Sequence, residues 1–352
     1  VRRERYRTTR TGELEPEHAT GNAGAGPKDA AVPDAPAAER NPAGLLIIES
    51  PLSVGLFAGK WYSYSSNTDL PNDQREEDGG ALVFETEALE GPLEILGAPE
   101  CRLRLKSSKP VAMVACRISD IAEDGSATRI TYGVLNLTHR DGHWAPEPLP
   151  VDQWFSVVVR LNHIAQRFAP GHRIRLSVST SYWPLVWPAP ESPRLTLDAT
   201  ACSLDLPVRT ETGPPSAAAG TDHANPGAAA RTGPGPSPEP RHFGPAESAS
   251  HPPHTILIPA HREWTVTHNL ANNKARLTVI NNDAKYRFEA DGWTIHREVT
   301  EEYSYRRNRY DTLRAEVRAT RSFEQGAWSA RTYTRTLLTS TKTHFRIQAT
   351  LD

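Results

Sequence analysis

Strict alternation of apolar and polar side chains, with no helical periodicity, constrains the fold of this chain most strongly. The segment ECRLRLK places Cys101, Leu103 and Leu105 on one side of an extended strand and three cations on the other. The segments FSVVVRLNH and HRIRLSVS alternate in the same way. A period of two is typical of a half-buried β-strand. Many short strands of this kind predict an all-β sandwich or barrel over residues 45 to 207.

Two turn signals support this prediction. Pro170-Gly171 suits the central pair of a type II turn, because proline fixes the first φ and glycine accepts a positive second φ. Asp124-Gly125 is a short hairpin signal. We therefore expect turns at both places.

Composition divides the rest of the chain. Residues 1 to 44 are rich in Ala, Gly, Pro and charge, which predicts a disordered N-terminal tail. Residues 208 to 254 contain Pro and Gly without a period and predict a disordered linker. Residues 255 to 352 again alternate, with apolar side chains on odd positions, and predict a second β module built as an antiparallel meander.

Charge and composition narrow the function. The formal net charge of 352 residues is −2, which gives no reason to expect a nucleic-acid or membrane-surface partner. The sequence has no apolar run long enough to span a membrane and no secretory apolar region, so we expect a cytoplasmic protein. Its three cysteines are scattered and predict neither a disulfide framework nor a metal site. The first residue is Val1, which suggests a processed chain or a fragment.

No catalytic motif is found. The strained elbow of α/β-hydrolases, G-x-S-x-G, does not occur, and neither do the glycine-rich phosphate loops. His139 and His143 could be read as a metal pair, but they lack a third nearby ligand. We therefore predict no catalytic residue, no metal site and no cofactor.

Clustered aromatic residues and one charged loop are the remaining candidates for a site. Aromatic residues in KWYSYSS and SYWPLVWP either plug the end of the sandwich or form a binding surface, and plugging is the commoner case. The loop LPNDQREEDGG is either a polar entry to a strand or a segment that docks on another domain. The candidate interface residues are Trp61, Tyr62, Asp73, Gln74, Arg75, Tyr182, Trp183 and Trp187.

Three separated blocks carry a family resemblance. They are DQREEDGGALVFETEALEGPLEILGAPECRLRLKS, ISDIAEDGSATRITYGVLNLTHR and LNHIAQRFAPGHRIRLSVSTSYWP. In this order they resemble the C-terminal, galactose-binding-like jelly-roll domain of the X-Pro dipeptidyl-peptidase and cocaine-esterase (CocE/NonD) family of serine hydrolases. The resemblance covers residues 45 to 207, and residues 255 to 352 look like the β extension of a larger subgroup.

The resemblance implies a non-catalytic role. In that family the Ser-Asp-His triad belongs to an α/β-hydrolase domain, which hydrolyses acyl esters or X-Pro peptides, and the jelly roll packs on it and helps to shape its pocket. That domain is absent from this sequence, so no triad residue can be assigned and the chain alone should be inactive. The expected partner is an α/β-hydrolase domain, in the same or another chain, and Trp183 should then be partly exposed. A free-standing carbohydrate- or protein-binding module is the alternative, and a homo-oligomer stays open.

Overall fold

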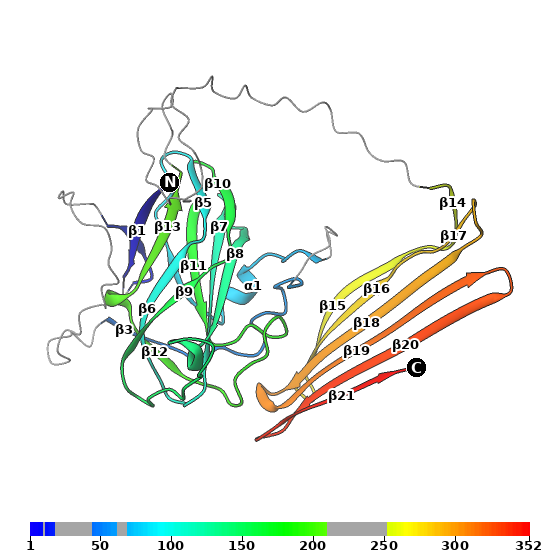
Figure 1. Cartoon of the computed structure of the whole chain (residues 1–352). Coiled ribbons are helices and arrows are strands. Elements are labelled where there is room, and N and C mark those ends of the chain that lie inside the picture. The colour runs from blue at the N-terminus through cyan, green and yellow to red at the C-terminus, as the bar shows by residue number, and fades with distance from the viewer. Residues whose placement is uncertain (10, 18–43, 62–68, 210–251) are drawn as a thin grey trace, which may run out of the picture.

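The computed structural model describes residues 1–9, 11–17, 44–61, 69–209 and 252–352. These residues form two β modules, a jelly-roll sandwich and a long C-terminal sheet (Figure 1). Apart from 3₁₀ turns, the described part of the chain holds one short helix, α1 (Arg75–Asp78). The prediction of an all-β fold is therefore confirmed. No described helix is long and apolar enough to cross a membrane.

The jelly roll is a sandwich of two antiparallel sheets. The larger, nine-stranded sheet contains β1 (Arg2–Thr8), β2 (Leu14–Pro16), β3 (Leu45–Ile48), β5 (Leu93–Gly97), β6 (Glu100–Ser107), β9 (Phe155–Arg160), β10 (Ile164–Phe168), β12 (Leu195–Asp198) and β13 (Ser203–Val208). The four-stranded sheet has the order β4 (Leu82–Glu85), β11 (Arg173–Ser179), β7 (Met113–Ile121) and β8 (Ala127–Asn136).

Alternation along the strands fills the space between these two sheets. Leu103 and Leu105 of β6 point into the core from one sheet, and Ile174 and Leu176 of β11 point into it from the other. All four side chains are buried. The two predicted turns are also present, since Gly171 has φ +80° and Gly125 has φ +82°, values that glycine adopts without strain.

The N-terminal segment is ordered where the sequence predicted disorder. Strand β1 pairs antiparallel with β13, and Tyr6 and Leu14 are buried in the core. The ion pair between Arg5 and Asp205 adds a contact between the two strands. The prediction of a disordered tail over residues 1 to 44 is therefore wrong for its first part. The prediction failed because it rested on the average composition of residues 1 to 44. This average does not reveal the short strand β1, whose arginines pair with acidic residues far away in the sequence, such as Asp205.

Residues 18–43 of the predicted tail lie outside the described residues. The same holds for residues 210–251, nearly all of the predicted linker. The sandwich itself begins with β1 rather than at residue 45, because β1 and β2 belong to its larger sheet.

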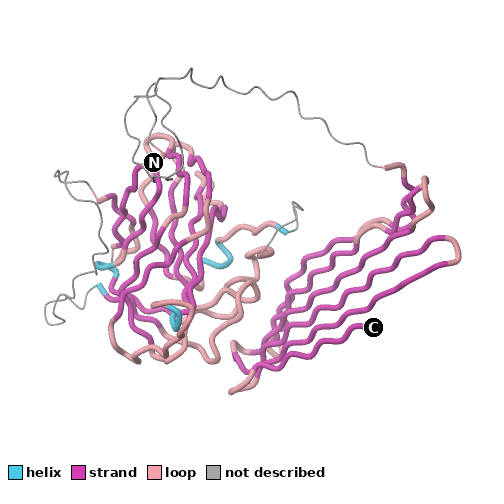
Figure 2. Tube along the Cα trace, viewed as in Figure 1, coloured by secondary structure: helices cyan, strands magenta, loops and turns pink. Residues whose placement is uncertain are grey.

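The C-terminal module is a single eight-stranded antiparallel sheet (Figure 2). Its strands are β14 (His254–Ile258), β15 (His261–Asn269), β16 (Lys274–Asn282), β17 (Lys285–Phe288), β18 (Thr294–Arg306), β19 (Arg309–Gln325), β20 (Trp328–Ser340) and β21 (Phe345–Leu351). Most are longer than the strands of the jelly roll. This architecture confirms the expected antiparallel β module.

One face of this sheet carries a row of mostly apolar side chains. The register places Tyr303 of β18 opposite Ala315 of β19, Ala315 opposite Leu338 of β20, and Leu338 opposite Ile347 of β21. Directly opposed residues share a face, so these side chains form one row across four strands. We call this side the apolar face. Figure 1 places the β18–β19 turn, at one end of the sheet, beside the jelly roll.

Candidate domain interfaces

The aromatic segment 182–187 lies between the two modules. Trp183 is fully buried, and its ring meets the ring of Trp187 edge-on with centroids 4.7 Å apart. On its other side it meets Tyr303 of β18 at 5.7 Å. Trp187 in turn contacts Phe345 of β21 at 5.0 Å. These edge-to-face contacts join the end of the sandwich to the apolar face of the C-terminal sheet.

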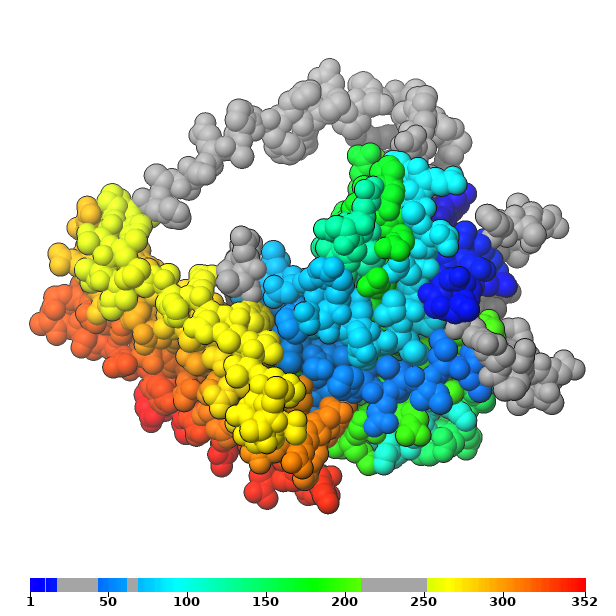
Figure 3. Space-filling view, turned by 180° about the vertical axis from the view of Figure 1, so that it is seen from behind, coloured from blue at the N-terminus to red at the C-terminus, as the bar shows by residue number. Residues whose placement is uncertain are grey.

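Segment 51–60 of the jelly roll completes this contact. Leu52 and Leu56 pack in one cluster with Trp183 and with Leu277 and Leu313 of the C-terminal sheet. Figure 3 shows the blue segment near residue 50 against the yellow strands of that sheet. We call the contact made by segments 51–60 and 182–192 with β15–β21 the inter-module interface.

Two polar contacts fix the edge of the inter-module interface. The backbone N–H of Leu52 donates a hydrogen bond to Oδ1 of Asn308 at 2.6 Å. Asn308 lies in the tight β18–β19 turn with φ 52°, a conformation that asparagine tolerates better than most residues. Lys60 Nζ lies 3.3 Å from Oε1 of Glu301 on β18. Sequence reasoning singled out neither Asn308 nor Glu301.

The expectation that Trp183 is partly exposed is wrong. The chain's own β18 and β19 cover its indole, so it does not face a separate domain. Sequence identified an aromatic cluster at the end of the sandwich, but the residue that covers it, Tyr303, lies 120 positions further along the chain. Trp183 therefore belongs to an interface within this chain.

Tyr182 plugs the end of the sandwich. It is fully buried, and its hydroxyl accepts a hydrogen bond from Nη1 of Arg129 at 2.6 Å. Burial raises the pKa of Tyr182 to about 12. Its ring lies 5.7 Å from that of Tyr132 on β8. For this residue the structure supports the plug interpretation over a binding surface.

The charged loop contains a buried anchor. Glu77 of α1 is buried, accepts hydrogen bonds from the backbone N–H groups of Gly55 and Phe57 at 2.9 and 2.8 Å, and pairs with Arg117 of β7. Burial raises the pKa of Glu77 despite the nearby guanidinium of Arg117. Glu77 thereby holds the segment that carries Leu52 and Leu56. Gln74 is also buried, and its amide donates to the carbonyl of Asn72 at 2.8 Å.

Further ion pairs continue this network. Arg117 lies 3.2 Å from Asp78, and Arg175 of β11 lies 2.8 Å from Asp78 and 2.6 Å from Glu85. Arg117 has no exposed side-chain surface. Sequence reasoning missed this network. The available signal was an arginine inside the otherwise apolar run MVACRI, residues 113–118.

The exposed candidates lie on a different surface. Asp73 pairs with Arg75, and this hydrogen bond holds the pKa of Asp73 below its ordinary value, with help from the backbone N–H groups of Arg75 and Ala127. Trp61 is 61% exposed and meets Tyr132 edge-on at 5.7 Å. Tyr62 lies outside the described residues.

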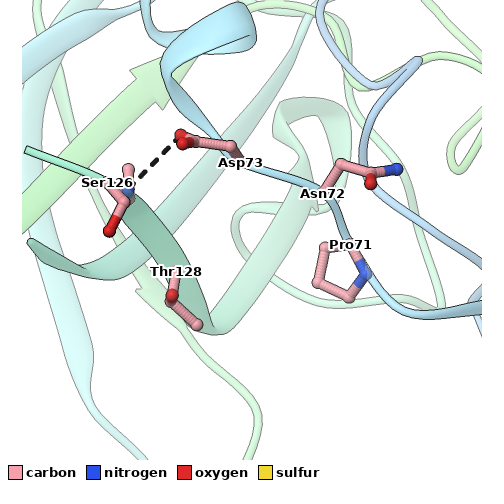
Figure 4. A pocket seen from close by; sticks show the side chains of 6 residues that line it. Pro71, Asn72, Asp73, Ser126 and Thr128 are labelled. Atoms are coloured by element: carbon pink, nitrogen blue, oxygen red, sulfur yellow. Dashed lines mark hydrogen bonds between the residues drawn. The ribbon is translucent and has the colours of Figure 1, made fainter. Parts of the chain in front are cut away.

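Backbone contacts place Trp61 beside the charged loop. Lys60 N donates to the carbonyl of Asp69, and Asn72 N donates to the carbonyl of Phe57, so the two segments run side by side. Leu70, which belongs to the second of these segments, is half exposed. A shallow pocket of about 180 Å³ opens beside Pro71, the residue that follows Leu70, and Figure 4 shows the side chains that line it. It is lined by Pro71, Asn72, Asp73, Ser126, Ala127 and Thr128.

We call this exposed surface the loop face. It consists of Trp61, Leu70, Pro71, Asp73, Arg75, Ser126 and Thr128. An apolar centre with a rim of paired charges is a common composition for a protein interface. The structure thus separates the sequence candidates into a buried group, Tyr182 and Trp183 with Gln74, and an exposed group on the loop face.

The histidine pair is close but exposed. Nδ1 of His139 lies 3.1 Å from Nδ1 of His143. Across the described residues, no group of three or more His, Cys, Asp or Glu side chains could hold a metal ion. Cys101, Cys116 and Cys202 are free and buried, so they act as small core side chains.

Comparison with known proteins identifies the family. Residues 11–229, more than half of the chain, match the X-Pro dipeptidyl-peptidase C-terminal non-catalytic domain. The cocaine esterase of Rhodococcus sp. (strain MB1 Bresler) is 28% identical over 116 residues, which cover 32% of this chain and 20% of that enzyme. This chain therefore aligns with about a fifth of the length of this curated relative.

Two solved structures are among those that a comparison of structures finds similar to part of this chain. An aminopeptidase from a marine sediment Thaumarchaeota archaeon has a TM-score of 0.45 at 19% identity, covering 60% of this chain and 37% of that one. An α-amino acid ester hydrolase has a TM-score of 0.46 at 21% identity, covering 58% of this chain and 36% of that one.

The two-sheet sandwich and the family match define the class of this protein as a jelly-roll module of the X-Pro dipeptidyl-peptidase C-terminal, non-catalytic type. The chain belongs to the X-Pro dipeptidyl-peptidase C-terminal domain family. The matched range begins at residue 11 and so includes β2, which agrees with the ordered N-terminal strands.

Proposed function

We propose that this chain docks through its loop face onto an α/β-hydrolase catalytic domain and helps to shape that domain's substrate pocket. The observation that carries the proposal is the exposed Trp61 beside a half-exposed Leu70, on the surface of a domain whose family is non-catalytic. The other aromatic candidates that the structure describes, Tyr182, Trp183 and Trp187, pack inside this chain, which favours the loop face as the surface for a partner.

Trp61 has the properties of an interface anchor. Tryptophan is enriched among the residues that contribute most to binding, especially where neighbours hold the ring in place. Tyr132 supports the ring of Trp61, and the guanidinium of Arg129 lies 4.5 Å over the centre of the Tyr132 ring. The Asp73–Arg75 pair forms a polar rim on the same surface.

In this complex, the α/β-hydrolase domain would supply the catalytic residues. Acyl transfer needs a nucleophile, a base within hydrogen-bond reach and oxyanion donors that act together. The family resemblance implies acyl esters or X-Pro peptides as substrates of the whole enzyme. A cytoplasmic location belongs to the same proposal and is supported by three buried free cysteines, since reduced thiols are usual in that compartment.

A binding titration tests the docking surface. An α/β-hydrolase catalytic domain of the cocaine-esterase type is titrated with the full chain by calorimetry. We expect Trp61→Ala to weaken binding by about 2 kcal/mol, roughly 30-fold, as for an interface hot spot. Trp144→Ala is the matched control, because Trp144 is fully exposed and lies outside the loop face. Equal affinities of the two variants, or no binding by the unaltered chain, would contradict the proposal.

Activity measurements test whether catalysis resides in the partner domain rather than in this chain. The purified chain should hydrolyse neither p-nitrophenyl esters nor X-Pro anilides above a heat-denatured control, and a fluorophosphonate probe should label none of its serines. Addition of the catalytic domain should give turnover that Trp61→Ala reduces. Stoichiometric labelling of a serine in this chain would overturn the non-catalytic role.

A further inference from the structure

Strand β21 is an edge of the C-terminal sheet. Among the described residues it ends the strand order and pairs with β20 alone. All seven of its residues are exposed, including Ile347 at 67% and Leu351 at 72%. In Figure 1 it forms the outer margin of the sheet. The side of β21 away from β20 therefore presents backbone groups that no described strand pairs, together with apolar side chains.

The register identifies the backbone groups on the free side. Tyr333 and Asp352 exchange both backbone hydrogen bonds, each at 2.9 Å, so Asp352 is directed toward β20. Direction alternates along an antiparallel strand. The even-numbered residues of β21 therefore bond to β20. The N–H and C=O groups of Phe345, Ile347, Ala349 and Leu351 point away from it.

Other edges of this sheet are better protected against a further strand. Strand β15 carries Arg262, Glu263 and two histidines, and the short β14 has an irregular register between Ile256 and Ile258. Charges and bulges are common devices that keep edge strands from pairing. Strand β21 has neither Pro nor Gly, and its one charged residue is Arg346. It is thus the least protected edge of the three.

We propose that β21 pairs antiparallel with β21 of a second copy of this chain, about a twofold axis at Gln348. In this register Ile347 lies opposite Ala349 of the partner subunit, and Phe345 lies opposite Leu351 of the partner subunit. Residues with free backbone groups then meet each other, so every such N–H finds a carbonyl. The pairing uses the full length of the strand.

Side chains agree with this register. Apolar residues lie opposite apolar residues on one face, where cross-strand pairs stabilise a sheet. On the other face Arg346 lies opposite Thr350 of the partner subunit, so no like charges are opposed. The two apolar faces join into one surface on the same side. Because only seven residues pair, we expect a weak dimer that forms at micromolar concentration.

Disulfide trapping tests the register. In Gln348→Cys the two cysteines would be opposed at the axis in a pair that lacks backbone bonds, with Cα atoms about 4.5 Å apart, which is within disulfide range. In the control Arg346→Cys the symmetry mates lie four residues apart in register, roughly 13 Å, which is too far. The three native cysteines are buried and do not compete. Oxidation by diamide should cross-link the first variant and leave the second monomeric.

Sedimentation tests the strand pairing without a cross-link. The sedimentation coefficient of the unaltered chain should rise with concentration toward that of a dimer. Ala349→Pro removes one outward N–H and none directed at β20, and proline is tolerated on edge strands. We expect it to weaken the dimer about tenfold or more, since two hydrogen bonds are lost by symmetry, while Gln348→Ala sediments like the unaltered chain. A monomer at all concentrations, or equal cross-linking of both cysteine variants, overturns the proposal.

Discussion

The two β modules of this chain share one sequence pattern but bury it in different ways. In the jelly roll, two sheets face each other and enclose a continuous core that includes Leu105 and Leu176. The C-terminal sheet has a single layer, and its buried apolar residues, such as Leu277 and Leu313, lie where the jelly roll covers them. At the margin, every residue of strand β21 is exposed to some extent, including Phe345 beside Trp187. A period of two thus predicts a sheet, but it does not predict which layer covers the apolar face of that sheet. The C-terminal sheet depends on the jelly roll for the burial of its apolar residues.

Separation of the modules is the most severe test of this dependence. Residues 1–209 should fold alone, because their core is enclosed by their own two sheets. Residues 252–352 should be largely unfolded or aggregated alone, because a sheet needs a partner for its apolar face. Far-UV circular dichroism and thermal melting of the two fragments measure this difference. A cooperative melt of the isolated C-terminal fragment would show that the sheet is independent.

Removal of one side chain should weaken the same contact inside the intact chain. Trp183→Ala deletes a fully buried indole between the modules, so we expect a loss of about 3–5 kcal/mol in the free energy of unfolding. The C-terminal sheet should also become sensitive to protease. Trp328→Ala is the control, because Trp328 is 53% exposed and contacts Trp293 away from the jelly roll. Similar destabilisation by the two variants would argue against a special role of the inter-module interface.

Acid should loosen the pairing of the N-terminal strand β1 with β13 of the jelly roll. Burial acts to raise the pKa of Asp205, but hydrogen bonds from Arg5 and Arg102 outweigh it and leave the pKa below the ordinary value. A lowered carboxyl pKa contributes stability above the ordinary aspartate pKa, and this contribution is lost as pH falls through the folded-state value.

Comparison with Asp205→Asn measures this contribution. At neutral pH the variant should be about 2 kcal/mol less stable, the scale of hydrogen bonds to a charged group. The difference should shrink as pH falls below about 4, near the ordinary aspartate pKa. Denaturant unfolding at several pH values provides the measurement, and Asp141→Asn serves as an exposed control. A difference that does not change with pH would exclude a role for the charge of Asp205.

The sequence predicted the positions of strands and turns well. It did not predict which residues are buried by segments far away in the sequence. The positions of β6 and β11 and the turn at Gly171 follow from side-chain period and glycine chemistry, which are local properties. The family blocks added the jelly-roll arrangement. By contrast, the burial of Trp183 depends on Tyr303, and the order of β1 depends on β13 about 200 residues away. Such contacts leave no periodic signal in either segment alone.

The smallest expected effect concerns the ion pair that bridges the modules. Lys60 lies 3.3 Å from Glu301 and 3.6 Å from Asp69, and its side chain is partly exposed. Exposed pairs contribute about 0–1 kcal/mol because solvent screens them and ordering the side chains costs entropy. A double-mutant cycle with Lys60→Met and Glu301→Gln should therefore give a coupling energy in this range, far below the loss expected for Trp183→Ala. A coupling energy of several kcal/mol would mean that charge, rather than apolar packing on Trp183, holds the C-terminal sheet to the jelly roll.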